Sequence, residues 1–560
     1  MFRRFLCCLA IIAAATATAA ALYLNFGYIR TAQPVVLTAP AANGMTVLLV
    51  PLDSRPPCTQ FVEQLGRLAG IRVVLPPTEL LDEYRTPANR TGLRDWLRSQ
   101  AANADAAIVS VDMLEHGGLL ASRLGTGTAA DAEAALEALS EAHRSNPQLK
   151  IYAFSIIPRL LVADNADSAR YQKKMLAYSV LKDEVLTFEN PRDRDKLQKV
   201  SAQLPPAVVN RYLSLYEANT QLNFRLLAMT EEGVLAGLVI GQDDGFPFGM
   251  PNMVKSRLSH YVARRPALAD RVVITRGTDE VALTLLGRIA MQAAGYRPRV
   301  FVRYSHPEAP GIVMPYMPHS MARTVAEKVA LIGGKLVDRA DGADFVLYVH
   351  AATAKTGPGL PAAAAREVRE LMAAGHRVGV VDLSEHFLAE DTLLPHLLRG
   401  GADLARLAAY AGWNTTSNSL GTAVTQAAVF TAALAGKGLR TDRLGLYKLQ
   451  YEFLASRMLD DWYYQKDVQP FVNRRLKMSK VDPYNLGEHM QQVEGWISGL
   501  MADRANTLLR DGLAGQTLPV RSADGKRYVV NGLALKCRLP WQRTFEVRLE
   551  PTLSFAVVNE

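Results

Sequence analysis

Short apolar runs alternate with helical stretches through much of this chain, and this alternation restricts its fold more than any other feature. The run at 45–50 is followed by a helical stretch that ends at Ala69, and the run at 106–111 by one at 130–143. Each run is apolar on both faces, as in a strand covered by helices on both sides. Strands that alternate with helices form parallel sheets with right-handed crossovers. We therefore expect an α/β fold with a mainly parallel sheet, either barrel-like or doubly wound.

The length of the chain, 560 residues, exceeds what one ordinary hydrophobic core holds. We expect a first α/β domain at 45–297, interrupted at 164–230 by a polar helical insertion that is either a lid or plain scaffold. A second α/β domain is expected at 298–436. The remainder, 437–560, is predicted to be helical with a C-terminal β tail, in which the alternation at 544–549 predicts a strand.

The N-terminus predicts export. Residues 1–30 begin with two arginines before a long apolar stretch without charge, as in an export signal or an uncleaved membrane anchor. A linker rich in Pro and Ala follows at 31–44. Positive charge before such a segment favours placement of the rest outside the cytoplasm, so we expect a periplasmic or extracellular protein, held at the inner membrane if the segment is retained. Cys58 and Cys537 could form a disulfide or remain two separate thiols.

Composition and missing motifs exclude several classes of function. The formal charge of +9 is modest for this length, and no basic run is interleaved with aromatic residues, so we expect no nucleic-acid partner. The sequence contains no phosphate loop, dinucleotide fingerprint or GxSxG elbow. We expect no organic cofactor, while a divalent metal stays possible.

The strongest candidate site follows the apolar run at 238–240, where Gln242, Asp243 and Asp244 come just before a glycine. In α/β folds, ligands bind beyond the carboxyl ends of the strands. Two adjacent carboxylates repel each other, which raises one pKa unless a cation relieves them. Side chains alternate along a strand, so both acids can serve one site only if the chain has turned at Gly241. A solvated turn or a helix cap is the structural alternative.

Similar polar residues follow other predicted strands or precede predicted helices. They are Asp53, Arg55, Asp112, His116, Arg159, Asp279, Glu280, Trp413, Asn414 and Asn418. Each also has a structural explanation, such as an ion pair, a tight turn or a carboxylate at a helix N-terminus. Because parallel strands end at one edge of a sheet, we expect the candidates of the first domain to gather within roughly 10–12 Å, facing Asn414 from the second.

Six segments carry a family resemblance. They are PLDSRPP at 51–57, VDMLEHGGLLASR at 111–123, GQDDG at 241–245, TRGTDEV at 275–281, YAGWNTTSNSLG at 410–421 and LPWQRTFEV at 539–547. Together they resemble the bacterial family known as domain of unknown function 4127. The resemblance implies a multi-domain α/β protein of bacterial origin, and it brings no activity or catalytic residue with it.

The leading functional hypothesis is an exported carbohydrate-active hydrolase, in particular a glycosidase, because glycoside cleavage needs two carboxyl groups in different protonation states. The adjacent pair is similar to that of substrate-assisted N-acetylhexosaminidases. By this analogy, Asp243 would orient the acetamido group and Asp244 would protonate the leaving oxygen. Asp112 is a further candidate base, and the other candidates would bind a small-molecule or oligosaccharide substrate. Two alternatives stay open: a non-catalytic envelope protein that binds a glycan or peptide, and a metal-dependent hydrolase that uses Asp53, Asp112, His116 and Asp243.

Overall fold

The structure, a computed structural model, describes residues 34–39, 41, 44–161, 169–522 and 524–559. The predicted export segment at 1–30 lies outside these residues. Among the helices of the described part, none combines the length and the apolar character needed to cross a membrane.

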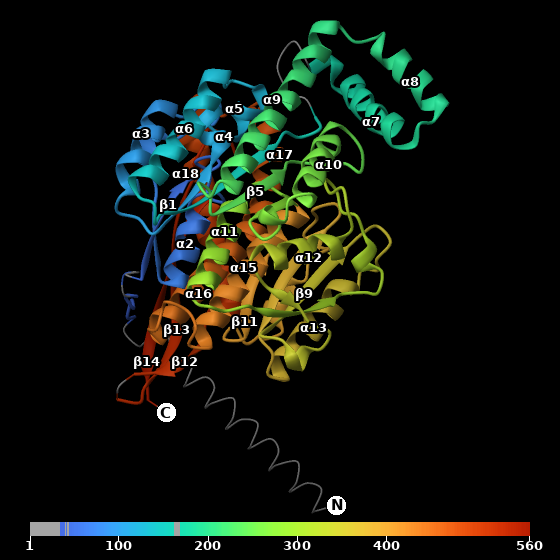
Figure 1. Ribbon diagram of the computed structural model, residues 1–560. Coiled ribbons are helices and arrows are strands. Elements are labelled where there is room, and N and C mark those ends of the chain that lie inside the picture. Colours follow the sequence, from blue (N-terminus) through green and yellow to red (C-terminus); the bar gives the residue numbers. More distant parts are fainter. Residues whose placement is uncertain (1–33, 40, 42–43, 162–168, 523, 560) are drawn as a thin grey trace, which may run out of the picture.

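The first α/β region is built on a sheet of six parallel strands in the order β2-β1-β3-β4-β5-β6 (Figure 1). The strands are β1 (Met45–Val50), β2 (Ile71–Val74), β3 (Ala106–Ser110), β4 (Lys150–Ile157), β5 (Gly237–Gln242) and β6 (Val272–Arg276). Val47 and Leu49 of β1 pack into one hydrophobic core, whereas Leu48 and Val50 pack into another on the opposite face. The sheet is therefore doubly wound. It ends at β2 and β6, so the barrel-like form of the expectation was wrong.

Helices cover both faces of this sheet, as the apolar runs predict. One face carries α2 (Gln60–Ala69) and α11 (Val281–Ala293), and the other carries α3 (Arg90–Ala101), α6 (Ala129–Ser145) and α9 (Pro206–Glu231). The remaining helices of this region are α4 (Val111–His116), α5 (Leu119–Leu124), α7 (Gln172–Phe188), α8 (Pro191–Ser201) and α10 (Met250–Ala263).

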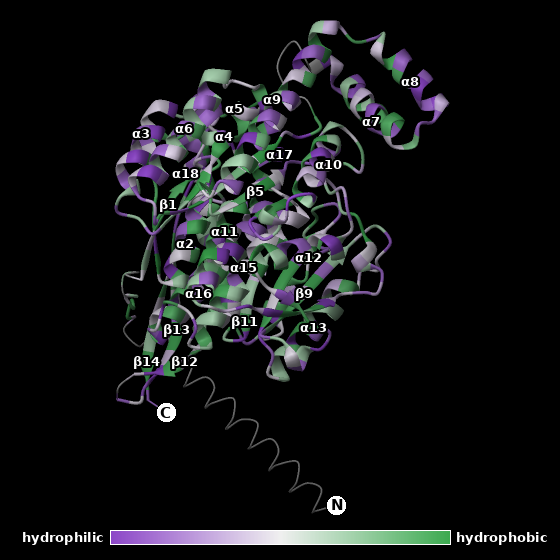
Figure 2. Cartoon of the chain, in the orientation of Figure 1, coloured by the Kyte–Doolittle hydropathy of each residue, from purple (hydrophilic) through white to green (hydrophobic). Residues whose placement is uncertain are grey.

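The helical insertion between β4 and β5 consists of α7, α8 and α9. In Figure 1, α7 and α8 extend away from the body of the molecule, and Figure 2 shows α8 as largely hydrophilic. Leu226 and Leu227 of α9 are fully buried in the core against the sheet. The insertion thus combines one scaffold helix with a projecting pair, while its predicted first residues, 164–168, lie outside the described part.

The second α/β region has five parallel strands in the order β11-β10-β9-β7-β8. They are β7 (Arg299–Tyr304), β8 (Lys335–Leu336), β9 (Phe345–Ala352), β10 (Val378–Ser384) and β11 (Leu407–Ala411), with helices α12 (Met321–Leu331), α13 (Leu360–Ala373), α14 (Leu394–Arg399) and α15 (Thr416–Leu434). Every residue of α15 is buried. This helix packs against α11 of the first region as well as β10 and β11 of its own. Its small side chains permit that close approach on all sides, so α15 joins the two regions into one core.

The C-terminal region is helical and ends in an antiparallel sheet, β12-β13-β14. Its elements are α16 (Arg443–Met458), the π-helix η6 (Leu459–Val468), α17 (Gln469–Met478), α18 (Met490–Leu508), β12 (Thr517–Arg521), β13 (Arg527–Arg538) and β14 (Arg548–Val558). The strand predicted at 544–549 was largely wrong, because residues 544–547 belong to a loop. Its carbonyls at Thr544 and Phe545 accept side-chain hydrogen bonds from the helical region instead of pairing in a sheet. Cys58 and Cys537 are both free thiols.

Candidate functional site

A cleft of about 560 Å³ lies where the carboxyl ends of the first sheet meet the start of α15 and the loop at 541–547. Most of the residues predicted from the sequence line it. They are Arg55, Arg159, Gln242, Asp243, Asp244, Asp279, Trp413, Asn414 and Asn418. The residues from the second region, Trp413 to Asn418, therefore face those of the first across one cleft, at the junction of the two α/β regions.

Asp243 is held by a guanidinium. Nε of Arg123 donates to its Oδ2 at 2.7 Å and Nη2 donates to its Oδ1 at 2.9 Å, while the backbone N–H of Asp244 also donates to Oδ1 at 2.8 Å. Burial opposes the charge of Asp243, but the attraction of Arg123 outweighs it and keeps the pKa below its usual range. Asp243 is therefore an ionised carboxylate whose two oxygens are both engaged.

Asp244 has the opposite character. Burial, reinforced by the negative charge of Asp243, raises the pKa of Asp244 to about 6. The two carboxyl groups both line the cleft because the chain leaves β5 after Gln242, rather than at Gly241 as the sequence suggested. Gly241 serves a different purpose: a Cβ at this position would lie 2.6 Å from the carbonyl oxygen of Gly277 on the neighbouring segment.

A second buried cluster lies beside this pair. Arg55 donates from Nε and Nη2 to Oδ2 of Asp53, at 2.9 and 2.7 Å, and from Nη2 to Oδ1 of Asp279 at 2.6 Å. Asn418 donates to the other oxygen of Asp279 at 3.3 Å. Burial raises the pKa of Asp279 to about 6, although Arg55 opposes the shift. Asp53 is fully buried behind Arg55 and does not line the cleft, so it acts on the site through the arginine.

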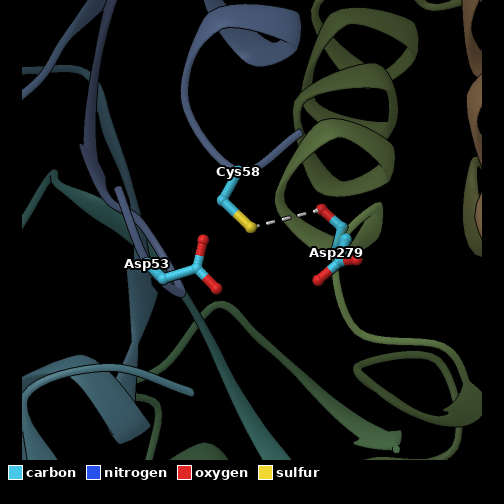
Figure 3. Close-up of side chains that lie close together, drawn as sticks. All are labelled: Asp53, Cys58 and Asp279. Atoms are coloured by element: carbon cyan, nitrogen blue, oxygen red, sulfur yellow. Dashed lines mark hydrogen bonds between the residues drawn. The ribbon is translucent and has the colours of Figure 1, made fainter. Parts of the chain in front are cut away.

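Asp53, Cys58 and Asp279 offer ligand atoms that lie within 4.8 Å of one another (Figure 3). The thiol donates to the backbone carbonyl of Asp279, 3.9 Å away, and burial raises the pKa of Cys58 well above its usual value. Because the Arg55 guanidinium already bonds both carboxylates, the three residues fit an ion-pair cluster better than a metal centre. Of the metal ligands predicted from the sequence, Asp243 lines the cleft, Asp53 is fully buried, and Asp112 and His116 line another cavity.

That cavity, of about 880 Å³, is lined by Asp112 and His116. Asp112 leaves the cleft because β3 ends at Ser110, whose side chain accepts a hydrogen bond at the start of α4. Within the short helix, the Asp112 carboxylate accepts a hydrogen bond from the backbone N–H of Ile156 at 2.9 Å. Burial raises the pKa of Asp112 to about 7 and lowers that of His116 to about 4. Asp112 thus lines this second cavity rather than the cleft, although the charge of Asp243 contributes to raising its pKa and Arg123 and Arg159 line both cavities.

Glu280 also lies outside the cleft. It forms an ion pair of 2.6 Å with Lys328, whose side chain is fully buried, and it accepts a hydrogen bond from Ser417 at 3.0 Å. A binding role was expected for both members of the pair. Asp279 lines the cleft, whereas Glu280 joins α12 and α15 to the end of β6.

Sequence reasoning missed several residues that line the cleft: Arg123, Arg276, Lys466, Trp541 and Arg543. Four of them lie inside the segments that carry the family resemblance, which was the available signal. Trp541 donates to Ser54 at 2.8 Å, and the Arg543 guanidinium lies 4.7 Å from the centre of its ring. Together they form an aromatic and cationic wall beside Arg55, whose guanidinium lies 5.5 Å from the centre of the Trp541 ring.

Lys466 reaches the cleft from η6, a π-helix of ten residues. Such widened turns often occur at functional sites. Burial lowers the pKa of Lys466, although Asp382 and Asp461 oppose the shift. No hydrogen bond or ion pair of its side chain is found among the described residues, so its amine is available to a ligand. Nothing in the local sequence marks this residue, because a π-helix has no simple periodic signature.

Comparison with known proteins agrees with the resemblance. No curated protein matches this chain. A family model described as protein of unknown function (DUF4127) matches residues 47–550, which include both α/β regions and nearly all of the C-terminal region. The chain therefore belongs to the DUF4127 family.

Proposed function

We propose that this protein is a carbohydrate-active hydrolase of the glycosidase type, with its active site in the cleft at the junction of the two α/β regions. The observation that carries the proposal is the pair of adjacent carboxyl groups with separated proton affinities. Asp243 is ionised against Arg123, whereas the pKa of Asp244 is raised to about 6. Titratable neighbours whose environments push their pKa values apart are typical of acid and base roles in glycoside cleavage.

In this proposal, Asp244 protonates the leaving oxygen. Both oxygens of Asp243 already accept hydrogen bonds, so its role is to maintain the field that keeps a proton on Asp244, rather than to hold an acetamido group. Asp279 supplies the second carboxyl group: Arg55 and Asn418 hold it in place on the same cleft. Above pH 6 it is mostly ionised and can accept a proton from water.

The walls of the cleft suit a sugar. Tyr316, which is 45% exposed, offers an aromatic face on which the apolar face of a pyranose can stack, while Trp413 and Trp541 line the cleft as buried rings. Asn414 and Gln465 add amide groups of the kind that bind sugar hydroxyls. A volume of about 560 Å³ is within the range of small-molecule sites and holds one or two sugar rings. Such a substrate agrees with the export that the N-terminal segment predicts.

The test measures turnover of a panel of purified bacterial envelope glycans and chromogenic glycosides. Turnover is detected as the release of reducing ends. We expect Asp244→Asn to reduce turnover by at least about 100-fold, the usual effect of losing a general acid, without lowering the melting temperature. Asp503→Asn, a change of an exposed residue on α18, is the matched control and should be fully active. Full activity of Asp244→Asn on a glycan that the wild type cleaves would exclude the proposal.

A non-catalytic glycan-binding protein is the second candidate. The extensive internal pairing of Arg55, Asp53 and Asp279 favours it, because a site whose groups are already fixed binds without rearrangement. Binding of a glycan without any product, at an affinity that Asp244→Asn leaves unchanged, would support this function over hydrolysis.

A further inference from the structure

Arg276 is the most unusual cation of the cleft. It ends β6 and pairs in register with Gln242 of β5, and both residues line the cleft. Its Nη1 donates to Glu327 of α12, but its Nε and Nη2 have no hydrogen-bond partner among the described residues, although the side chain is only 2% exposed. Leaving a buried donor unsatisfied is costly, above all for a charged group, so this edge of the guanidinium indicates a ligand.

Lys255 of α10 adds a second such group. Its Nζ is buried and likewise has no hydrogen-bond partner in the part of the chain that the structure describes. Burial, together with the nearby charge of Arg276, lowers the pKa of Lys255 to about 7, and Glu327 opposes this shift. Burial and the nearby cations also lower the pKa of His319 to about 4.

The charges around these two residues do not balance. Glu327 is the acid that faces both of them. It also forms an ion pair with Arg323 of the same helix, whose Nε lies 3.5 Å from Oε1 of Glu327. Lys328 is close as well, but its charge is matched by Glu280. One carboxylate is thus shared among three cations. Buried charge without a partner is costly, so an additional anion would stabilise this cluster, of which Arg276 lines the cleft and Lys255 does not.

We propose that Arg276 and Lys255 form a subsite that binds an anionic group on the substrate, so that the substrate is an acidic sugar bearing a carboxylate or a phosphate ester. The Nε and Nη2 atoms lie along one edge of the guanidinium and can donate two parallel hydrogen bonds to the two oxygens of such a group. Lys255 supplies a point charge behind it. This inference rests on the proposed function for the sugar and extends it by the charge of the substrate.

Calorimetric titration of three probes tests the subsite: D-glucuronate, D-glucose 1-phosphate and D-glucose. The wild type should bind at least one anionic probe about tenfold or more tightly than glucose, and the preferred anion identifies the group. Lys255→Met should remove most of that preference without changing the affinity for glucose. Lys150→Met, which changes an exposed lysine at the opposite end of β4, is the matched control and should behave as the wild type.

Arg276→Gln should remove the preference as well. Because this change leaves Glu327 without its partner, the double variant Arg276→Gln/Glu327→Gln is included to preserve folding. As an independent measurement, sulfate should slow the acetylation of Lys255 by acetic anhydride at pH 7, followed by mass spectrometry, and should not affect Lys150.

Equal affinity for charged and neutral probes, together with unprotected Lys255, would overturn the subsite and leave water as the partner of these atoms. The titrations are repeated on Asp244→Asn, which separates the two proposals. If Asp244→Asn keeps the anion preference but loses turnover completely, both the hydrolase and the subsite are supported. Turnover that survives Asp244→Asn removes the hydrolase alone, and anion binding unaffected by Lys255→Met and by the double variant removes the subsite alone.

Discussion

Arg123 and Asp243 form a two-point ion pair, with Nε to Oδ2 at 2.7 Å and Nη2 to Oδ1 at 2.9 Å, across 120 residues of sequence. The pair fixes a negative charge at the end of β5, immediately before Asp244. Burial is the main cause of the raised pKa of Asp244, and the charge of Asp243 adds to it over a short distance with little screening, whereas the charge of Arg123 opposes the shift. The chemistry proposed for Asp244 therefore depends on an arginine that does not itself react.

The first prediction is the pH profile of turnover. Asp244 must carry its proton to act as the acid, and its pKa is about 6. Asp279, whose pKa is also about 6, must lose its proton to act as the base. We therefore expect kcat/KM to peak near pH 6 and to fall on both sides, approaching about tenfold per pH unit. The profile is measured on whichever glycan the wild type cleaves. A rate that is constant from pH 5 to pH 8 would assign the acid to another group.

The second prediction concerns Arg123→Met. This change leaves the buried Asp243 carboxylate without its cation, so the free energy of unfolding at pH 7 should fall by about 3–5 kcal/mol in urea titrations. The loss should shrink towards pH 4, where Asp243 can take up a proton. Arg225→Met breaks an exposed ion pair with Glu133 and serves as the control, with a much smaller expected effect. Equal losses in the two variants would contradict the assigned role of Arg123.

The third prediction is a pH-dependent gain from Asp112→Asn. The pKa of Asp112 is about 7 in the folded chain and near 4 in the unfolded chain. Between these values the folded state binds more protons, so this residue makes the protein less stable as the pH rises, by up to about 4 kcal/mol. Asparagine keeps an oxygen for the backbone N–H of Ile156 and carries no charge.

The gain is measured as the difference in unfolding free energy between Asp112→Asn and wild type. It should be small at pH 4, grow up to pH 7 and then stay constant. A difference that is the same at pH 4 and pH 8 would show that the carboxyl group of Asp112 does not titrate in this range.

The fourth prediction addresses metal binding at Asp53, Cys58 and Asp279. Because Arg55 bonds both carboxylates, we expect Zn²⁺ to leave the melting temperature of the wild type unchanged. In Arg55→Met the two buried carboxylates lose this cation, and Zn²⁺ should then raise the melting temperature by several degrees. One equivalent of zinc in the purified wild type, lost in Cys58→Ser, would instead show that these three residues form a metal centre.

The sequence by itself determined the class of fold and the edge at which the polar residues gather. Runs such as 238–240, apolar on both faces, require cover on both sides, and the helices between them impose parallel order. Asp243, Asp244 and Asp279 could then be placed together, because the carboxyl ends of parallel strands share one edge. Family segments already contained Arg123 and Arg276, although their partners could not be recognised.

Only the tertiary structure decided which of these residues work together. Asp112 does not line the cleft, because Ser110 caps a helix that starts one residue earlier than the apolar run suggests. The carboxylate of Asp112 therefore accepts a hydrogen bond from the backbone of Ile156. Lys466 lines the cleft from a π-helix of the C-terminal region. Local periodicity records which face of an element is buried. It does not record which distant charge will meet a buried carboxylate, because that pairing depends on how separate elements pack, and the packing sets the pKa values on which the proposed chemistry depends.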